Sequence, residues 1–234
     1  MPEIILSLLK TLGNQGLRVL DLDINPEDYL QLDLSENNTD LKHVNLASSQ
    51  DFSAYINDIL VQSSSKVGFG GYLEQRALYK RSSYFNTKNE EEERNIHLGI
   101  DLWCEAGTGI LAVWDGEIHS FKNNTNFGDY GPTIILKHKV DGITFYSLYG
   151  HLSLESISGI EQGDSIKGGT CIGALGTSEV NGDYPPHLHF QLILDLNDNF
   201  GDYPGVCSKN TLEFYKLNCP DPELLLHLKT TKND

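Results

Sequence analysis

Residues 187–194 read HLHFQLIL, a mostly apolar segment with the character of a β-strand, and Pro185-Pro186 limits how the chain enters it. Segments of the same kind, separated by Gly or Asp-Gly pairs, lie upstream at 109–114, 133–138 and 144–149. Short strands with turn signals every 8–12 residues or so favour a β-sandwich or a partly closed barrel. Strands and helices do not alternate, so a parallel doubly wound sheet is not expected. From about residue 96 onward we predict β structure throughout.

Two histidines stand in this segment at the positions of alternate strand residues. On a strand, His187 and His189 point to the same face with their backbones about 7 Å apart. Both imidazoles can then reach one metal ion, or one can bind the ion while the other meets its water. A lone H-x-H pattern is more often two polar residues on an exposed strand face, so this pair needs support from elsewhere in the chain.

A second motif, HLGID, occupies residues 97–101. On a straight strand His97 and Asp101 would stand about 13 Å apart, too far to share a metal. A bend at Gly99, or a helical turn, brings them together, and the β-rich surroundings favour the bend. By itself an H-x-x-x-D match is a weak signal.

A third histidine, His151, follows an aromatic-rich strand and the turn residue Gly150. Three imidazole-bearing segments and a carboxylate form a first-choice ligand set for zinc, with three protein ligands and one position for water. An uncoordinated histidine would then handle the proton or the oxyanion, because no H-E-x-x-H motif is present. The remaining histidines have no motif around them and are expected to be structural: His43, His119, His138 and His227.

Residues 1–65 differ from the rest of the chain. Apolar residues recur at helical spacing between Ile4 and Leu12, and residues 51–60 predict a second amphipathic helix. We therefore expect an N-terminal helical and loop region at 1–65, which could pack over one end of a groove, and a β domain at 66–234.

Composition narrows the partners. The 234 residues carry a formal net charge of −16 and 39% hydrophobic residues. This acidity argues against nucleic acid or an anionic membrane as partner, because both require a basic face. The N-terminus lacks a basic leader and a small-residue cleavage site, so we expect a cytoplasmic protein unless the sequence is a mature form. The cysteines are expected to be reduced: Cys104, Cys171, Cys207 and Cys219.

Between about residues 95 and 194 the chain resembles the lysostaphin/LytM-type zinc metallopeptidases, the peptidoglycan endopeptidase family. The resemblance rests on four motifs in order: HLGID at 97–101, YGHL at 149–152, GTCIGALGTS at 169–178 and HLHF at 187–190. Other stretches resemble the peptidase-like domain that is fused to class III aminotransferases: 70–76, 129–133, 201–206 and 219–222.

The resemblance implies a Zn²⁺ site with His97, Asp101 and His189 as ligands, and His151 and His187 as the catalytic pair. It also implies a mainly β fold, an antiparallel barrel-sandwich of the duplicated hybrid motif, and a peptide or peptidoglycan-like substrate. Gln191 stands where the family commonly has Glu, and we expect this difference to have little effect.

Two other readings remain open, and the oligomeric state is not predicted. One is a non-catalytic module that binds a peptide or glycan on the same fold, although intact ligands and both catalytic histidines count against it. The other is a phosphocarrier with a related barrel-sandwich and a pair of histidines, which would lack the H-x-x-x-D ligand pair. One tightly bound zinc per chain would support the hydrolase, and the absence of metal would refute it.

Overall fold

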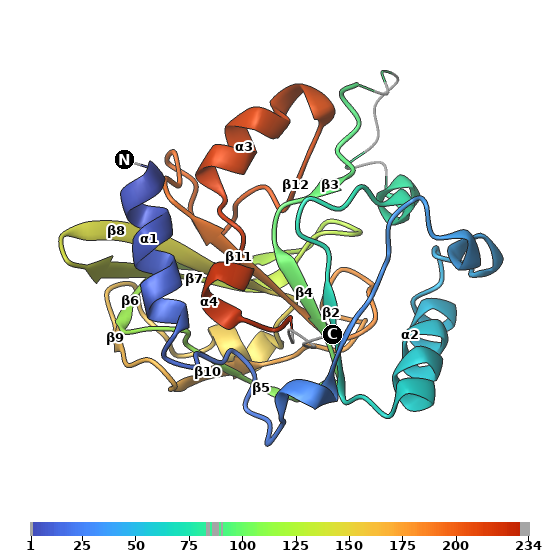
Figure 1. Cartoon of the computed structure of the whole chain (residues 1–234), viewed down its shortest axis with the longest axis horizontal. Helices are drawn as coiled ribbons and strands as arrows, with labels where there is room; N and C mark the ends of the chain where they lie inside the picture. The colour runs from blue at the N-terminus through green and yellow to red at the C-terminus, as the bar shows by residue number, and fades with distance from the viewer. Residues whose placement is uncertain (1, 83–84, 86–88, 90, 230–234) are drawn as a thin grey trace, which may run out of the picture.

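The computed structural model describes residues 2–82, 85, 89 and 91–229. Its largest element is an eight-stranded sheet in which all neighbouring strands are antiparallel except β1 and β2 (Figure 1). In spatial order the strands are β1 (Tyr29–Gln31), β2 (Val67–Gly70), β4 (Ile100–Trp103), β11 (His187–Ile193), β8 (Ile143–Gly150), β7 (Gly131–Val140), β6 (Gly116–Asn124) and β9 (Ser165–Ile166).

Two small sheets complete the β structure. They pair β5 (Gly109–Leu111) with β10 (Cys171–Ala174), and β3 (Ile96–His97) with β12 (Val206–Cys207). The prediction of a mainly β protein is confirmed. The large sheet runs from β1 at one edge to β9 at the other and does not close within the described residues. The barrel-sandwich arrangement therefore stays a prediction.

Strand β11 lies in the middle of the large sheet and is buried on both faces. Its side chains alternate, as the period of a strand requires. Leu188, Phe190 and Leu192 join the main hydrophobic core, and His187 and His189 face the opposite side. One strand thus supplies both core residues and site residues, and the rigidity of the core fixes the histidines.

The N-terminal region contains the two predicted helices, α1 (Pro2–Gly13) and α2 (Ser49–Ser63). Helix α1 lies beside α4 (Glu223–Leu226), and its Leu9 enters the main core (Figure 1). Helix α2 begins at a Ser48 side chain that accepts a hydrogen bond from the Asp51 N–H, a standard N-cap. The buried side chains of α2 belong to a second hydrophobic cluster, which lies against the site. The division near residue 65 stays a prediction, because β1 and β2 lie on opposite sides of it and are hydrogen-bonded.

Three details differ from the sequence-based expectations. Helices α3 (Leu212–Asn218) and α4 end the chain, so β structure does not continue throughout. The sheet is mixed rather than antiparallel, because β1 pairs with β2 in parallel. Strand β1 was not predicted, since its three residues are too few to show an alternating pattern. The strand expected at 109–114 ends at Leu111. Short 3-10 helices occur at Pro26–Asp28, Thr39–His43, Ala77–Arg81, Leu154–Ile157 and Lys209–Thr211.

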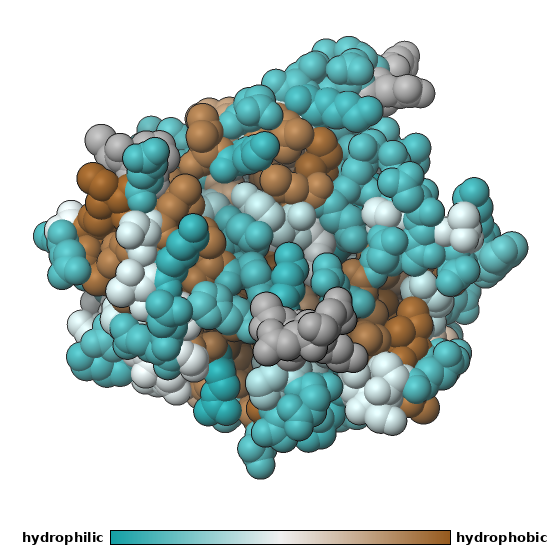
Figure 2. Space-filling model, in the orientation of Figure 1, coloured by the Kyte–Doolittle hydropathy of each residue, from teal (hydrophilic) through white to brown (hydrophobic). Residues whose placement is uncertain are grey.

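The visible surface is mostly polar, with apolar residues gathered over α1 and α3 (Figure 2). On α1, Ile4 is exposed, and on α3, Phe214 and Leu217 are exposed. Among the helices of the described residues, none is both long and apolar enough to cross a bilayer.

Candidate metal centre

The bend predicted at Gly99 is confirmed. His97 ends β3, and Asp101 lies in β4, which belongs to a different sheet. Because the chain turns between them, the His97 Nε2 atom lies 3.2 Å from Asp101 Oδ1. A Cβ atom at Gly99 would stand 2.7 Å from both the His189 ring and the Phe190 carbonyl oxygen, so only glycine permits this approach.

The register of β11 explains why residues far apart in sequence meet. His189 lies opposite Asp101 of β4 on one side and opposite Gly150 of β8 on the other. His151, the next residue after Gly150, turns at φ +63° out of the end of β8. All five predicted residues, His97, Asp101, His151, His187 and His189, thereby reach one pocket and are buried.

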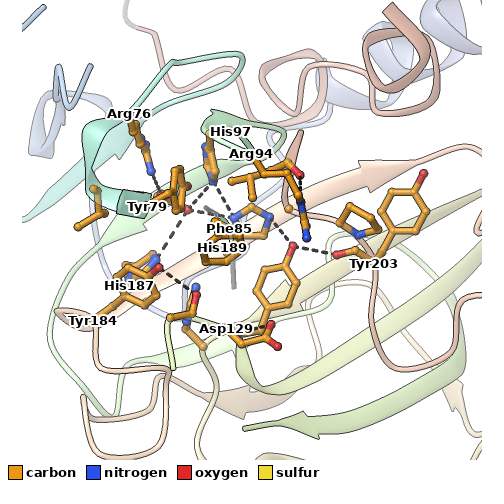
Figure 3. Close-up of a pocket in the computed structure, with 18 of the residues that line it drawn as sticks. Arg76, Tyr79, Phe85, Arg94, His97, Asp129, Tyr184, His187, His189 and Tyr203 are labelled. Atoms are coloured by element: carbon orange, nitrogen blue, oxygen red, sulfur yellow. Dashed lines mark hydrogen bonds and ion pairs between the residues drawn. The ribbon is translucent and has the colours of Figure 1, made fainter. Parts of the chain in front are cut away.

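Three of these residues converge most tightly (Figure 3). His189 Nδ1 lies 2.8 Å from His97 Nε2 and 3.2 Å from Asp101 Oδ1. A tetrahedral ion with ligand bonds of about 2.0–2.2 Å separates its ligand atoms by roughly 3.3–3.6 Å. The observed spacing is slightly contracted from that geometry. His97, Asp101 and His189 can therefore hold a metal ion.

The hydrogen bonds of the two histidines support this conclusion. His97 Nδ1 lies 3.0 Å from the Gly71 carbonyl, which can only accept, so Nδ1 carries the proton. His189 Nε2 lies 2.9 Å from Gln191 Oε1 and donates to it. The facing atoms, His97 Nε2 and His189 Nδ1, are then both unprotonated. Two lone pairs beside a carboxylate oxygen have no proton to share, so a cation is the group that fits between them.

Gln191 makes hydrogen bonds that the sequence did not suggest. Its amide nitrogen donates to the Pro204 carbonyl at 3.2 Å and to Cys219 Sγ at 3.3 Å. These two contacts fix the amide so that Oε1 faces His189. A glutamate could accept from His189 but could not donate to Pro204. The amide of Gln191 therefore holds its oxygen towards His189. The expectation that Gln in place of Glu has little effect stays untested.

The electrostatics of the centre follow from burial. Burial lowers the pKa of His97 to about 4, against the opposing effect of Asp101. Burial acts to raise the pKa of Asp101, but His97 and Arg76 outweigh it, and that pKa falls well below its ordinary value. At neutral pH the centre therefore offers a neutral imidazole and a charged carboxylate.

His151 and His187 lie beside the three converging residues. Their ring centroids are 4.2 Å apart, and His187 Nε2 is 3.8 Å from Asp101 Oδ1. His151 Nδ1 donates to the Asn181 carbonyl at 2.7 Å, and His187 Nδ1 donates to the Pro185 carbonyl at 2.8 Å. Each ring therefore keeps an unprotonated Nε2. Burial lowers the pKa of His187 to about 4 and that of His151 well below its ordinary value.

The five residues open on a cavity of about 180 Å³. Aromatic rings make up much of its wall, from Tyr79, Phe85, Trp103, Tyr130, Tyr184 and Tyr203. The Tyr130 hydroxyl donates to the Tyr203 carbonyl at 3.1 Å and lies 3.5 Å from His189 Nε2. These rings carry no signal in the sequence, because isolated aromatic residues in strands and loops form no motif.

Arg76 was not predicted to belong to the site. It is buried beside Asp101, with its Nη1 atom 2.5 Å from Asp101 Oδ2. A lone arginine 25 positions before its partner gives no signal in the sequence. The predicted structural roles of His43, His119 and His227 are compatible with their positions away from the pocket, as is that of His138, which bonds the Asp115 carbonyl.

Part of the chain is similar to known proteins. Residues 95–199, which include all five site residues, match the model of peptidase family M23. An uncharacterized metalloprotease of Buchnera aphidicola subsp. Baizongia pistaciae (strain Bp) is 33% identical over 119 residues, which make up 50% of this chain and 29% of that protein. The matched residues include the His-Asp-His cluster described above.

A second curated relative is the glycyl-glycine endopeptidase ALE-1 of Staphylococcus capitis, 31% identical over 103 residues, or 44% of this chain and 26% of ALE-1. The matched region thus spans less than a third of either relative's length. Among solved structures, the catalytic domain of lysostaphin from Staphylococcus simulans is similar at 23% identity and a TM-score of 0.39. That match covers 70% of this chain and 97% of the lysostaphin domain.

Proposed function

We propose that this chain is a zinc-dependent metalloendopeptidase that hydrolyses a peptide bond with water as the nucleophile. The observation that carries the proposal is the convergence of two unprotonated imidazole nitrogens and one carboxylate oxygen in a buried pocket. The match of residues 95–199 to a peptidase family supports it independently of the geometry.

Zinc suits the residues that would hold it. His97, Asp101 and His189 supply two nitrogens and one oxygen, and three protein ligands are typical of catalytic rather than structural zinc sites. When bound, zinc supplies Lewis acidity, which polarises a carbonyl group and brings the pKa of water near neutrality. The charged carboxylate of Asp101 balances part of the ion's charge.

We assign proton transfer to His151 and His187. Each keeps an unprotonated Nε2, because its Nδ1 proton is bound to a backbone carbonyl. One imidazole accepts a proton from the attacking water and later donates it to the departing amine nitrogen. While it carries that proton, the same imidazole can donate a hydrogen bond to the oxyanion that forms on the carbonyl oxygen, and the other orients the water by accepting a hydrogen bond from it. Neither task requires a glutamate.

The substrate class is a peptide or a peptidoglycan-like peptide. A cavity of about 180 Å³ with aromatic walls leaves little room for bulky side chains next to the scissile bond. Glycine-rich peptides are therefore the first candidates, and one curated relative is named as a glycyl-glycine endopeptidase. The net charge of −16 supports the absence of nucleic acid or an anionic membrane from the partners. The compartment and the resemblance to the peptidase-like domain that is fused to class III aminotransferases stay predictions.

Metal analysis joined to a cleavage screen tests the proposal. The purified chain should carry one zinc per molecule and cleave a member of a panel of glycine-rich peptides or purified peptidoglycan. His189→Ala should lose the zinc, whereas His187→Ala should keep it and lose turnover. A chain that binds no zinc would sink the proposal. Zinc binding without cleavage of any panel member would favour a non-catalytic binding module instead.

A further inference from the structure

Arg76 is a buried arginine that the proposed reaction does not use. Its side chain is 2% exposed, although it lies beside the pocket. The backbone around it is fixed by β3: the Leu73 and Arg76 N–H groups donate to the carbonyls of His97 and Asn95, and the His97 N–H donates to the Glu74 carbonyl. The segment 73–76 therefore cannot shift without moving a residue of the metal centre.

The guanidinium group joins two carboxylates. Its Nη1 lies 2.5 Å from Asp101 Oδ2, and its Nε lies 2.6 Å from Glu74 Oε2. The Asp101 side chain is 2% exposed and that of Glu74 is 14% exposed, so water screens neither pair strongly. Hydrogen bonds between charged groups at such distances are the strong and directional ones.

The contact divides the two oxygens of Asp101 between separate tasks. Oδ2 is bound to Arg76, whereas Oδ1 lies 3.2 Å from both His97 Nε2 and His189 Nδ1. Turning the carboxylate to present both oxygens to a metal would break the bond to Arg76 in a buried setting. We propose that Arg76, braced by Glu74, is a positioning residue that makes Asp101 a one-oxygen ligand of the metal.

Glu74 ties this arrangement to the N-terminal region. Its second oxygen, Oε1, accepts the backbone N–H of Leu34 at 3.1 Å. Leu34, Glu74, Arg76 and Asp101 thus form one continuous chain of hydrogen bonds. Residues 1–65 thereby contribute to the support of the metal centre.

The planar shape of the guanidinium group suits its position between two carboxylates. One planar guanidinium reaches two carboxylates from different edges, which the single ammonium of lysine does less well. Gly71 makes room for it, because a Cβ atom at that position would collide with Arg76 Nη2. An apolar residue of similar length would fill the space but leave Asp101 free to turn.

The test measures zinc affinity and the visible absorption spectrum of the Co²⁺-substituted chain, two readouts that do not depend on cleavage. Arg76→Met should weaken zinc binding by about 10–100-fold and alter the Co²⁺ spectrum as the number of oxygen ligands changes. Arg76→Lys restores a charge beside Asp101 and should bind zinc more tightly than Arg76→Met. Lys137→Met, which breaks an exposed pair with Glu117, is the matched control and should change neither readout.

The outcomes separate this inference from the proposed function on which it rests. A wild-type chain that binds no zinc would overturn both. A wild-type chain that binds zinc, together with an Arg76→Met chain of equal affinity and unchanged Co²⁺ spectrum, would overturn only the inference. Arg76→Lys binding no better than Arg76→Met would show that a positive charge beside Asp101 does not support the ligand, and would also overturn it. If Arg76→Met does not fold, Arg76→Lys carries the test, with a changed Co²⁺ spectrum expected and an unchanged spectrum and affinity overturning the inference.

Discussion

The indole of Trp103 is stacked on the imidazole of His187, with ring centroids 4.0 Å apart and an interplanar angle of 21°. Phe52 of α2 meets the same indole edge-on at 5.5 Å. Helix α2 therefore supports His187, for which we propose a catalytic role, through one intervening ring. The orientation of His187 is set from two sides, by this stack and by the Pro185 carbonyl.

Replacing the stacked ring should affect turnover and leave the metal in place. We expect Trp103→Leu to lower kcat about tenfold, because a loosened imidazole spends less time in the reactive orientation. Trp103→Phe, which keeps an aromatic face, should retain most of the activity. Zinc content and kcat are measured together, with Trp114→Leu as the control for loss of a tryptophan. Equal activity of Trp103→Leu and the wild-type chain would refute the role of the stack.

Gln191 should separate metal affinity from stability. Gln191→Met removes the acceptor for His189 Nε2, and we expect zinc affinity to fall by about 10–100-fold. Gln191→Glu keeps an acceptor but loses the donor to Pro204, so it should bind zinc and unfold more easily, by about 1–3 kcal/mol. Chelator competition and urea unfolding of both variants provide the two measurements. The reverse pattern would show that the amide does not orient His189.

Gly99→Ala should disrupt the metal centre. A Cβ atom there would meet the His189 ring and the Phe190 carbonyl at 2.7 Å, and a carbonyl of the central strand cannot give way easily. We expect zinc affinity to fall at least tenfold. Gly109→Ala is the matched control, since its nearest neighbour is a side-chain atom of Asp21 at 3.0 Å. Comparable zinc binding by both variants would contradict the prediction.

His138 should make stability depend on pH away from the metal centre. Burial lowers its pKa from 6.5 to about 4, while the Asp115 carbonyl accepts from its Nδ1. Above pH 6.5 the residue is neutral in both the folded and unfolded states. As the pH falls from 6.5 towards 4, only the unfolded state takes up the proton, so the folded state loses stability.

The expected loss from this one residue is about 2 kcal/mol between pH 7.5 and pH 5. Urea unfolding of the wild-type chain and His138→Gln at both pH values isolates it, because the other buried histidines contribute equally to both proteins. The variant should show the smaller decrease. An identical decrease in the two proteins would mean that His138 is protonated in the folded state.

The strands and the five site residues could be predicted because they are encoded locally. Alternation at His187 and His189 fixes a shared face, and Gly99 marks the bend that joins His97 to Asp101. Strand geometry showed only that these residues could meet, and the expectation of one site that also includes His151 rested on the resemblance to the lysostaphin/LytM-type family. The structure brings these side chains together in the register that a central strand imposes.

The supporting residues could not be predicted, because their partners lie far away in sequence and on other elements. Arg76 contacts Asp101 because the loop that carries Arg76 pairs with β3, and Trp103 contacts Phe52 because α2 packs beside it. Neither relationship leaves a spacing pattern in the chain. The C-terminal helices α3 and α4 were not predicted for another reason. They are seven and four residues long, which is too short to show a helical period in the sequence.

The parallel pairing of β1 with β2 has a consequence for how separate molecules behave. Strand β2 is fully buried, and β1 covers the hydrogen-bonding edge that it would otherwise present. An uncovered edge of that kind is a template for strand addition between molecules, and so for aggregation. With three residues flanked by Asp28 and Asp33, β1 is itself a poor template. The N-terminal region thus protects the sheet from self-association.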